Sequence, residues 1–62
     1  MQIGFIGTGT MGNSMAKALI EAGHAVTVHD LRRESATNLC EIGASWAGSP
    51  RELAAASTVV FS

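Results

Sequence analysis

The segment Gly-Thr-Gly-Thr-Met-Gly at residues 7–12 constrains the fold of this chain more than any other part of the sequence. It follows an apolar run at residues 2–6 and precedes a helical pattern. A strand, a glycine-rich turn and a helix in this order form a cradle for phosphate groups, because the helix start stabilises an anion. Gly7 permits a tight turn, Gly9 lets a ligand approach the backbone, and Gly12 allows close helix–strand packing.

Two further patterns place this turn in a β-α-β unit. Apolar residues recur at helical spacing after the turn, at Met15, Ala16, Leu19 and Ile20. Gly23 lies where the cap of a helix ending near Ala22 belongs. A strand predicted at residues 25–29 is followed by Asp30, 18 residues after Gly12. A carboxylate there accepts hydrogen bonds from adenosine ribose hydroxyls, so the pattern favours a dinucleotide site over a structural turn beside a solvated aspartate.

The rest of the chain continues the alternation. A helix ending near residue 42, a strand at 44–47, a helix at 50–56 and a strand at 58–61 are predicted. Ser49 is expected to cap the third helix, with Pro50 in its first position and Glu52 completing a capping box. The order β-α-β-α-β-α-β indicates an α/β fold, the N-terminal part of a Rossmann-type doubly wound parallel sheet with strand order 3-2-1-4.

Composition and charge argue against several other classes of protein. The chain has 62 residues, a net charge of −1 and no basic patch, so nucleic-acid binding has no support. Cys40 is the only cysteine and there are two histidines, so neither a disulfide framework nor a metal site is expected. No apolar run has membrane-spanning length and no signal peptide is recognisable. We expect a cytoplasmic protein, or one in an organelle whose targeting segment lies outside this chain.

Residues 5–19 resemble the N-terminal signature of the β-hydroxyacid dehydrogenases. That family includes 3-hydroxyisobutyrate dehydrogenase, tartronate semialdehyde reductase and, more distantly, 6-phosphogluconate dehydrogenase. The features that carry the resemblance are Met11, Met15, Ala16 and Leu19, with the later pairs Gly43-Ala44 and Ser49-Pro50. Thr8 departs from the pattern, since many members have leucine there.

The resemblance implies reversible hydride transfer between a nicotinamide cofactor and a small β-hydroxyacid. It also implies a helical domain, absent from residues 1–62, that forms the substrate site and usually the homo-oligomer. The catalytic lysine of the family belongs to that domain, so Lys17 is interpreted as a surface side chain. Residues 1–62 are thus expected to be a partial NAD(P)-binding domain, inactive alone. An apolar strand at an uncovered sheet edge likewise indicates the front part of a longer protein.

The predicted cofactor contacts lie in the glycine-rich turn and just after the second strand. They are Gly7, Thr8, Gly9, Thr10, Met11, Gly12, Asp30, Leu31 and Arg32. Asp30 would repel a 2′-phosphate, and Leu31 stands where NADP-using relatives often have arginine. NAD is therefore favoured. NADP stays possible, because Arg32 and Arg33 could partly compensate, although Arg32 fits a solvated charge equally well.

The same sequence features are compatible with other functions. An imine or 6-phosphogluconate-type reductase would use the same scaffold, and a non-catalytic nucleotide-binding module would keep the fold without the chemistry. His29, Cys40 and Trp46 are interpreted as structural residues. Asn13 and Ser14 could reach a phosphate from the first helix, although polar residues are common there.

Overall fold

The structure, a computed structural model, describes residues 2–7 and 9–61, with the side chains of Thr10 and Met11 left out. Its sheet contains the parallel strands β1 (Gln2–Ile6), β2 (Ala25–His29), β3 (Ser45–Trp46) and β4 (Val59–Phe61), in the order β3-β2-β1-β4. The connecting helices are α1 (Thr10–Glu21), the 3₁₀ turn η1 (Arg33–Ala36), α2 (Thr37–Glu41) and α3 (Pro50–Ala55). The predicted α/β class and strand order 3-2-1-4 are confirmed.

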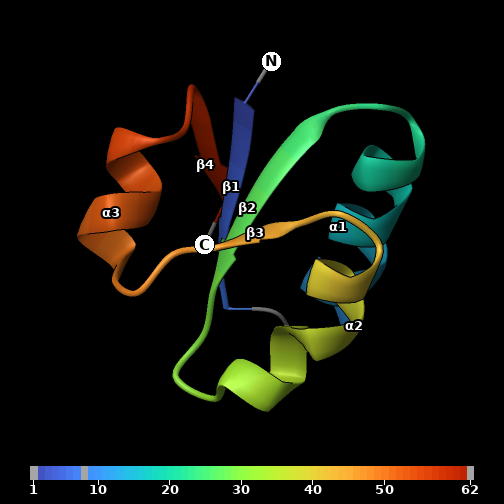
Figure 1. The fold of residues 1–62 in the computed structure, drawn as a ribbon, viewed down its shortest axis with the longest axis horizontal. Coiled ribbons are helices and arrows are strands. Elements are labelled where there is room, and N and C mark those ends of the chain that lie inside the picture. The colour runs from blue at the N-terminus through green and yellow to red at the C-terminus, as the bar shows by residue number, and fades with distance from the viewer. Residues whose placement is uncertain (1, 8, 62) are drawn as a thin grey trace.

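Helices cover both faces of the sheet, with α1 and α2 on one side and α3 on the other (Figure 1). The main core lies between the sheet and the α1–α2 layer. It consists of Ile3, Phe5, Ala16, Val26, Val28, Ala36, Leu39 and Ala44. The alternation of side chains along β1 and β2 sends every second residue into this core, and each large apolar side chain buried there contributes about 1.5–3 kcal/mol. The ring of Phe5 also stacks on Phe61 of β4, with centroids 5.2 Å apart.

A glycine in the middle of β1 lets α3 approach the opposite face. The side chain of Leu53 in α3 is fully buried. A Cβ atom on Gly4 would collide with the Leu53 side chain and with Oγ of Ser57. The Ser57 hydroxyl is itself fixed, because it donates a hydrogen bond of 2.6 Å to the Leu53 carbonyl. Gly4 therefore sets the distance between α3 and the sheet, a role that the sequence did not reveal.

The two predicted glycine caps are confirmed. Gly23 and Gly43 follow α1 and α2 with φ angles of +95° and +123°. After Gly23, the His24 N–H donates to the Leu19 carbonyl at 3.0 Å, and the equivalent bond follows Gly43. This arrangement satisfies carbonyls that a helix end otherwise leaves unpaired.

The start of α3 follows the expected signal with one difference. Oγ of Ser49 accepts a hydrogen bond from the Glu52 N–H at 3.2 Å, and Pro50 occupies the first turn. The Glu52 carboxylate, however, accepts its bond from the Gly48 N–H at 2.8 Å rather than from Ser49. A Cβ atom at Gly48 would lie 3.0 Å from this carboxylate, so the glycine makes room for the contact.

Four details differ from the sequence-based expectation. The second helix begins with the 3₁₀ turn η1, and the third and fourth strands are shorter than predicted. Met15 is 47% exposed, although its spacing assigned it to the apolar face of the first helix. Of the apolar residues of α1, Ala16 is buried in the core, whereas Leu19 and Ile20 are only partly buried against it. Cys40 is likewise half-buried.

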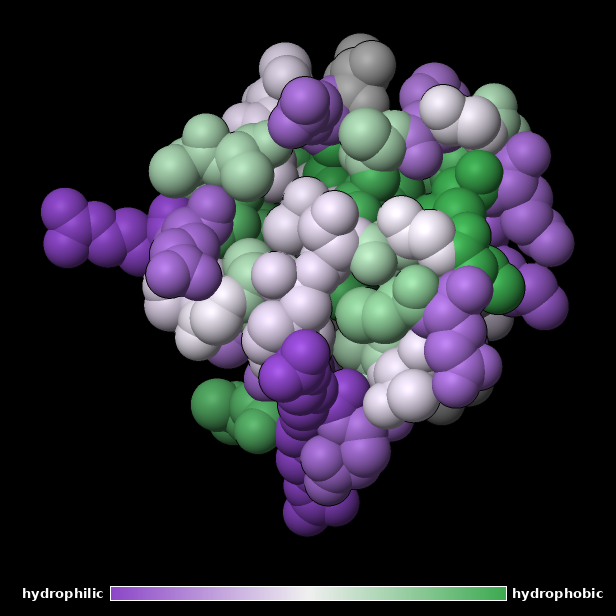
Figure 2. All heavy atoms as spheres, viewed as in Figure 1, coloured by the Kyte–Doolittle hydropathy of each residue, from purple (hydrophilic) through white to green (hydrophobic). Residues whose placement is uncertain are grey.

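The surface is consistent with this layering. Figure 2 shows hydrophilic side chains projecting mainly from the rim of the face in view, whereas paler and hydrophobic residues occupy its centre. Among the residues that the structure describes, no helix has the length and apolar character needed to span a membrane.

Gly4→Ala should destabilise the protein by about 1–3 kcal/mol, because the new methyl group overpacks the contact with Leu53 and Ser57. The measurement is the free energy of unfolding in urea. Gly48→Ala is the matched control, since its nearest neighbour is the movable end of the Glu52 side chain. Equal losses in the two variants would contradict the role assigned to Gly4.

Candidate functional site

The candidate site lies where β1 and β2 end side by side. Ile6 and His29, the last residues of these strands, are paired in register. Beyond them, the Gly7 N–H donates a hydrogen bond of 2.8 Å to the His29 carbonyl. This bond places the glycine-rich turn directly next to Asp30. Ligands of open parallel sheets bind at this carboxyl edge of the strands.

Each glycine of the turn has the property expected of it. Gly7 has a φ angle of +84°, which side chains disfavour. A Cβ atom on Gly12 would lie 3.1 Å from the Gly7 carbonyl oxygen, a tight contact, so the glycine eases the close approach of α1 to the end of β1. A Cβ atom on Gly9 would meet no atom of the described residues within 4 Å. Among these residues, the space over Gly9 is thus open, as a bound phosphate group requires.

The start of α1 is suited to an anion. Gly9 is its N-cap and has no side chain to bond the first amides, and no acidic residue lies in the first turn. The twelve-residue helix therefore presents its positive end to the space over Gly9. A negative group near such a helix end is stabilised by about 0.3–1 kcal/mol. The open backbone and the helix end together fit the pyrophosphate of a dinucleotide.

The residues after β2 are accessible at the same edge. The half-buried Asp30 accepts a hydrogen bond through Oδ1 from the Arg32 N–H at 3.0 Å. This short loop fixes the direction of the carboxylate, whose two oxygens can each accept more than one bond. Leu31 is 100% exposed and Arg32 is exposed at the start of η1.

The structure thus brings Gly7, Gly9, Gly12 and residues 30–32 to one edge of the sheet. Thr8 lies outside the described residues, and Thr10 and Met11 are described only as backbone of the first turn of α1. The assignment of these nine residues as cofactor contacts stays a prediction.

Sequence reasoning missed the role of one residue in α1. The Asn13 side chain pairs with Asn38 of α2 through two amide hydrogen bonds of 3.1 and 2.9 Å, and it also donates to the Ser35 carbonyl at 3.3 Å. The sequence alone makes Asn13 a candidate phosphate contact. No sequence signal links two asparagines 25 positions apart, because only the tertiary fold brings them together.

Aromatic and basic side chains pack together at the neighbouring β3. The protonated Nδ1 of His29 donates a hydrogen bond of 2.8 Å to the Ala47 carbonyl, and its ring centroid lies 5.5 Å from that of Trp46. The Arg33 guanidinium lies 5.4 Å from the Trp46 ring centroid, a cation–π contact. These contacts agree with structural roles for His29 and Trp46. The cation–π contact also holds the Arg33 side chain against Trp46.

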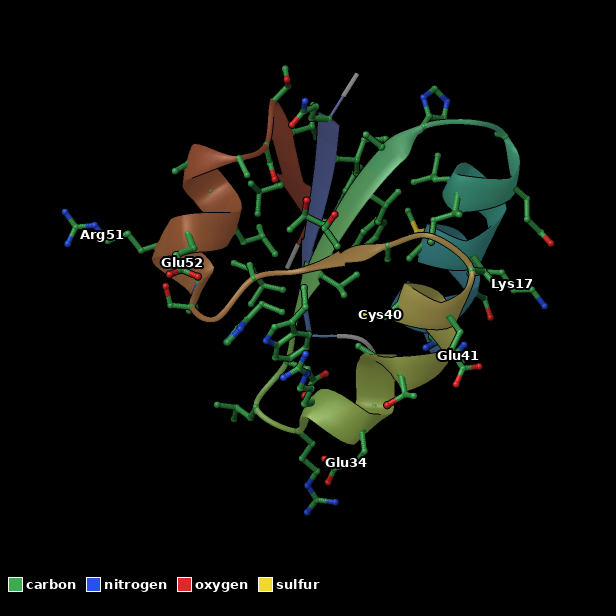
Figure 3. The ribbon with its side chains drawn as sticks, viewed as in Figure 1. Lys17, Glu34, Cys40, Glu41, Arg51 and Glu52 are labelled. Atoms are coloured by element: carbon green, nitrogen blue, oxygen red, sulfur yellow. The ribbon has the colours of Figure 1, made fainter. Side chains whose placement is uncertain are left out.

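The remaining candidates lie on the helices. Cys40 borders a cavity of about 290 Å³ that is also lined by Arg33, Thr37 and Glu41. Figure 3 shows Lys17 extending outward from α1, and the residue is exposed, as a surface lysine is expected to be. Within residues 2–7 and 9–61 no three histidine, cysteine or acidic side chains gather as a metal site would need.

Residues 2–62 match the family model described as the NAD binding domain of 6-phosphogluconate dehydrogenase. The chain belongs to this family. The predicted resemblance is thereby confirmed, and so is the expectation of a nicotinamide dinucleotide as its ligand at the level of the family.

Particular relatives are dehydrogenases and reductases by name. The chain is 48% identical over 60 residues to the probable 3-hydroxyisobutyrate dehydrogenase-like 1, mitochondrial, of Arabidopsis thaliana, covering 97% of the chain and 18% of that protein. It is 42% identical to the 3-hydroxyisobutyrate dehydrogenase of Pseudomonas aeruginosa, covering 97% of the chain and 20% of that protein. The chain therefore spans about a fifth of the length of these relatives.

Solved structures agree with the fold. An imine reductase from Pseudomonas sp. superposes with a TM-score of 0.92 at 37% identity, covering 95% of the chain and 20% of that structure. An imine reductase from Myxococcus stipitatus in complex with NADP+ gives a TM-score of 0.93 at 27% identity, with 97% and 21% covered.

Gly9→Val should weaken dinucleotide binding at least tenfold while leaving the fold intact. Its side chain would fill the open space over the helix start, and the backbone there, with φ of −63° and ψ of −179°, accepts any residue. The measurement is fluorescence titration with NAD and NADP. Ala18→Val, which enlarges an exposed residue of the same helix, serves as the control. Unchanged dissociation constants in Gly9→Val would mean that the phosphates bind elsewhere.

Proposed function

We propose that this chain is the N-terminal, cofactor-binding part of a longer oxidoreductase that transfers a hydride between a nicotinamide dinucleotide and a small β-hydroxyacid. The observation that supports the proposal is the hydrogen bond from the Gly7 N–H to the His29 carbonyl, because it brings the glycine-rich turn next to Asp30. The names of the relatives support the reaction class. The substrate site and the homo-oligomer interface would belong to a further, helical domain.

Each candidate residue has a distinct part in this proposal. The Gly9 backbone and the first amides of α1 would hold the pyrophosphate, with Gly7 and Gly12 shaping the turn. The Asp30 carboxylate would accept bonds from the adenosine ribose hydroxyls. The fully exposed Leu31 and the neighbouring Arg32 would lie against the adenosine. The nicotinamide supplies the hydride chemistry when the cofactor is bound.

We further propose that NAD is preferred over NADP. A 2′-phosphate would bring up to two negative charges beside the Asp30 carboxylate. Two unit charges about 4 Å apart repel by about 1 kcal/mol in water and about 4 kcal/mol at an effective dielectric constant of 20. A half-buried carboxylate lies between these limits, which corresponds to roughly tenfold to several hundredfold discrimination. Arg33 packs on Trp46. Arg32, which is also closer to Asp30 in the sequence, is therefore the positive charge that could offset this repulsion.

The double substitution Asp30→Asn with Leu31→Arg should shift the preference toward NADP, since it removes the repulsion and adds a phosphate partner. The measurement is the ratio of kcat/KM for the two cofactors in the full-length enzyme at matched ionic strength. Asp30→Asn alone should give an intermediate ratio, and Arg32→Ala should reduce any residual use of NADP. A wild-type enzyme that already prefers NADP would show that Arg32 outweighs Asp30.

An imine-type reductase is the second candidate, because solved imine reductases share the fold closely and one of them is in complex with NADP+. A substrate panel separates the two: oxidation of β-hydroxyacids supports the dehydrogenase, whereas reduction of cyclic imines alone supports the imine reductase. Dinucleotide binding with no turnover in either assay would indicate a non-catalytic nucleotide-binding module.

For the cellular compartment, we propose the cytoplasm or an organelle reached through a segment outside this chain. Several relatives carry the word mitochondrial in their names.

The 62-residue chain alone should not reduce NAD with any β-hydroxyacid, because the proposed substrate site lies in another domain. The test is absorbance at the NADH band with the purified chain and a hydroxyacid panel, with the full-length enzyme as the positive control. Turnover by the short chain would show that its own residues carry the catalytic group.

A further inference from the structure

The amide of Asn13 connects the phosphate cradle to the segment that follows β2. Asn13 lies one residue after Gly12, and its backbone N–H makes a helical bond of 2.8 Å to the Gly9 carbonyl. Its side chain reaches across to η1 and α2, where it bonds the Ser35 carbonyl and the Asn38 amide. The residue therefore belongs to the cradle through its backbone and to the neighbouring segment through its side chain.

From Ser35 the hydrogen bonds continue to Asp30. The Ser35 N–H donates to the Arg32 carbonyl at 3.1 Å, and the Arg32 N–H donates to the Asp30 carboxylate at 3.0 Å. An unbroken series of hydrogen bonds and peptide groups thus runs from the start of α1 to the candidate ribose contact. Each bond contributes about 0.5–1.5 kcal/mol.

Apolar packing does little to hold this segment. Residues 31–35 are all exposed, and the next fully buried side chain is that of Ala36. Arg33 has its contact with Trp46, but that contact faces β3 rather than the cradle. The hydrogen bonds of the Asn13 side chain therefore tie this exposed segment to α1, in addition to the packing of Ala36 and Leu39 in the core.

The separation between the pyrophosphate cradle and the Asp30 carboxylate is important for binding a dinucleotide. The pyrophosphate and the adenosine ribose are joined covalently, so the groups that bind them must be held at one separation. Binding groups have to lie within about 0.5 Å of their productive positions to act together. We propose that Asn13, paired with Asn38, is a positioning residue that sets the distance between the pyrophosphate cradle and the Asp30 carboxylate. This inference rests on the dinucleotide-binding function proposed above.

Asparagine suits this place because its amide donates and accepts at once. An aspartate at position 13 could still accept from the Asn38 amide but could not donate to the Ser35 carbonyl. Asn38→Ala would remove the paired amide and leave only the bond to Ser35. The three variants Asn13→Ala, Asn13→Asp and Asn38→Ala therefore remove different parts of the connection.

The experiment measures dissociation constants for NAD and NADP by fluorescence titration of the full-length protein. In Asn13→Ala the ratio of the two constants should move toward unity by at least threefold, because a displaced Asp30 neither bonds the 2′-hydroxyl nor repels the 2′-phosphate. Asn13→Asp and Asn38→Ala should give smaller shifts in the same direction. They also keep the test decisive if Asn13→Ala does not fold. Lys17→Ala, an exposed residue of the same helix, is the control and should leave the ratio unchanged.

The outcomes separate this inference from the function on which it rests. A wild-type protein that binds neither dinucleotide overturns the proposed function and the inference with it. A wild type that discriminates between NAD and NADP, with all three variants keeping its ratio even if their Tm falls, overturns only the positioning role. A change of ratio confined to the asparagine variants supports it.

Discussion

The contact of Gly12 with the Gly7 carbonyl is the constraint on which the rest of the site depends. It fixes where α1 begins relative to the end of β1, since any Cβ atom at position 12 would come within 3.1 Å of that oxygen. The same turn carries the Gly7 amide to the His29 carbonyl and so ties β1 to β2. The glycine-rich turn and Asp30, which form the candidate site, thereby follow adjacent strands at the same edge of the sheet.

Local patterns in the sequence predicted much of this arrangement. The strand order, the turn at Gly7 and the caps at Gly23 and Gly43 follow from local patterns in the sequence, and these features of the fold are observed as expected. The helical spacing that wrongly buried Met15 failed because periodicity says which side chains share a face, not how far the opposing layer extends.

Contacts between distant segments could not be predicted in the same way. The space that Gly4 leaves for Leu53 and the pairing of Asn13 with Asn38 join residues from separate elements. Neither a glycine within a strand nor an asparagine within a helix has a distinctive local signature. The glycine-rich turn of the candidate site could therefore be predicted from local sequence, whereas the contacts that support the segment after β2 could not.

The packing of Arg33 on Trp46 gives this domain an internal optical reporter. Trp46 is the only tryptophan of the chain, and Arg33 opens η1, directly after the loop that carries Asp30 and Arg32. Indole emission responds to a charge held over the ring. Any movement of that loop that changes the distance of 5.4 Å between guanidinium and ring will therefore alter the fluorescence of Trp46, without a label and without a chemical step.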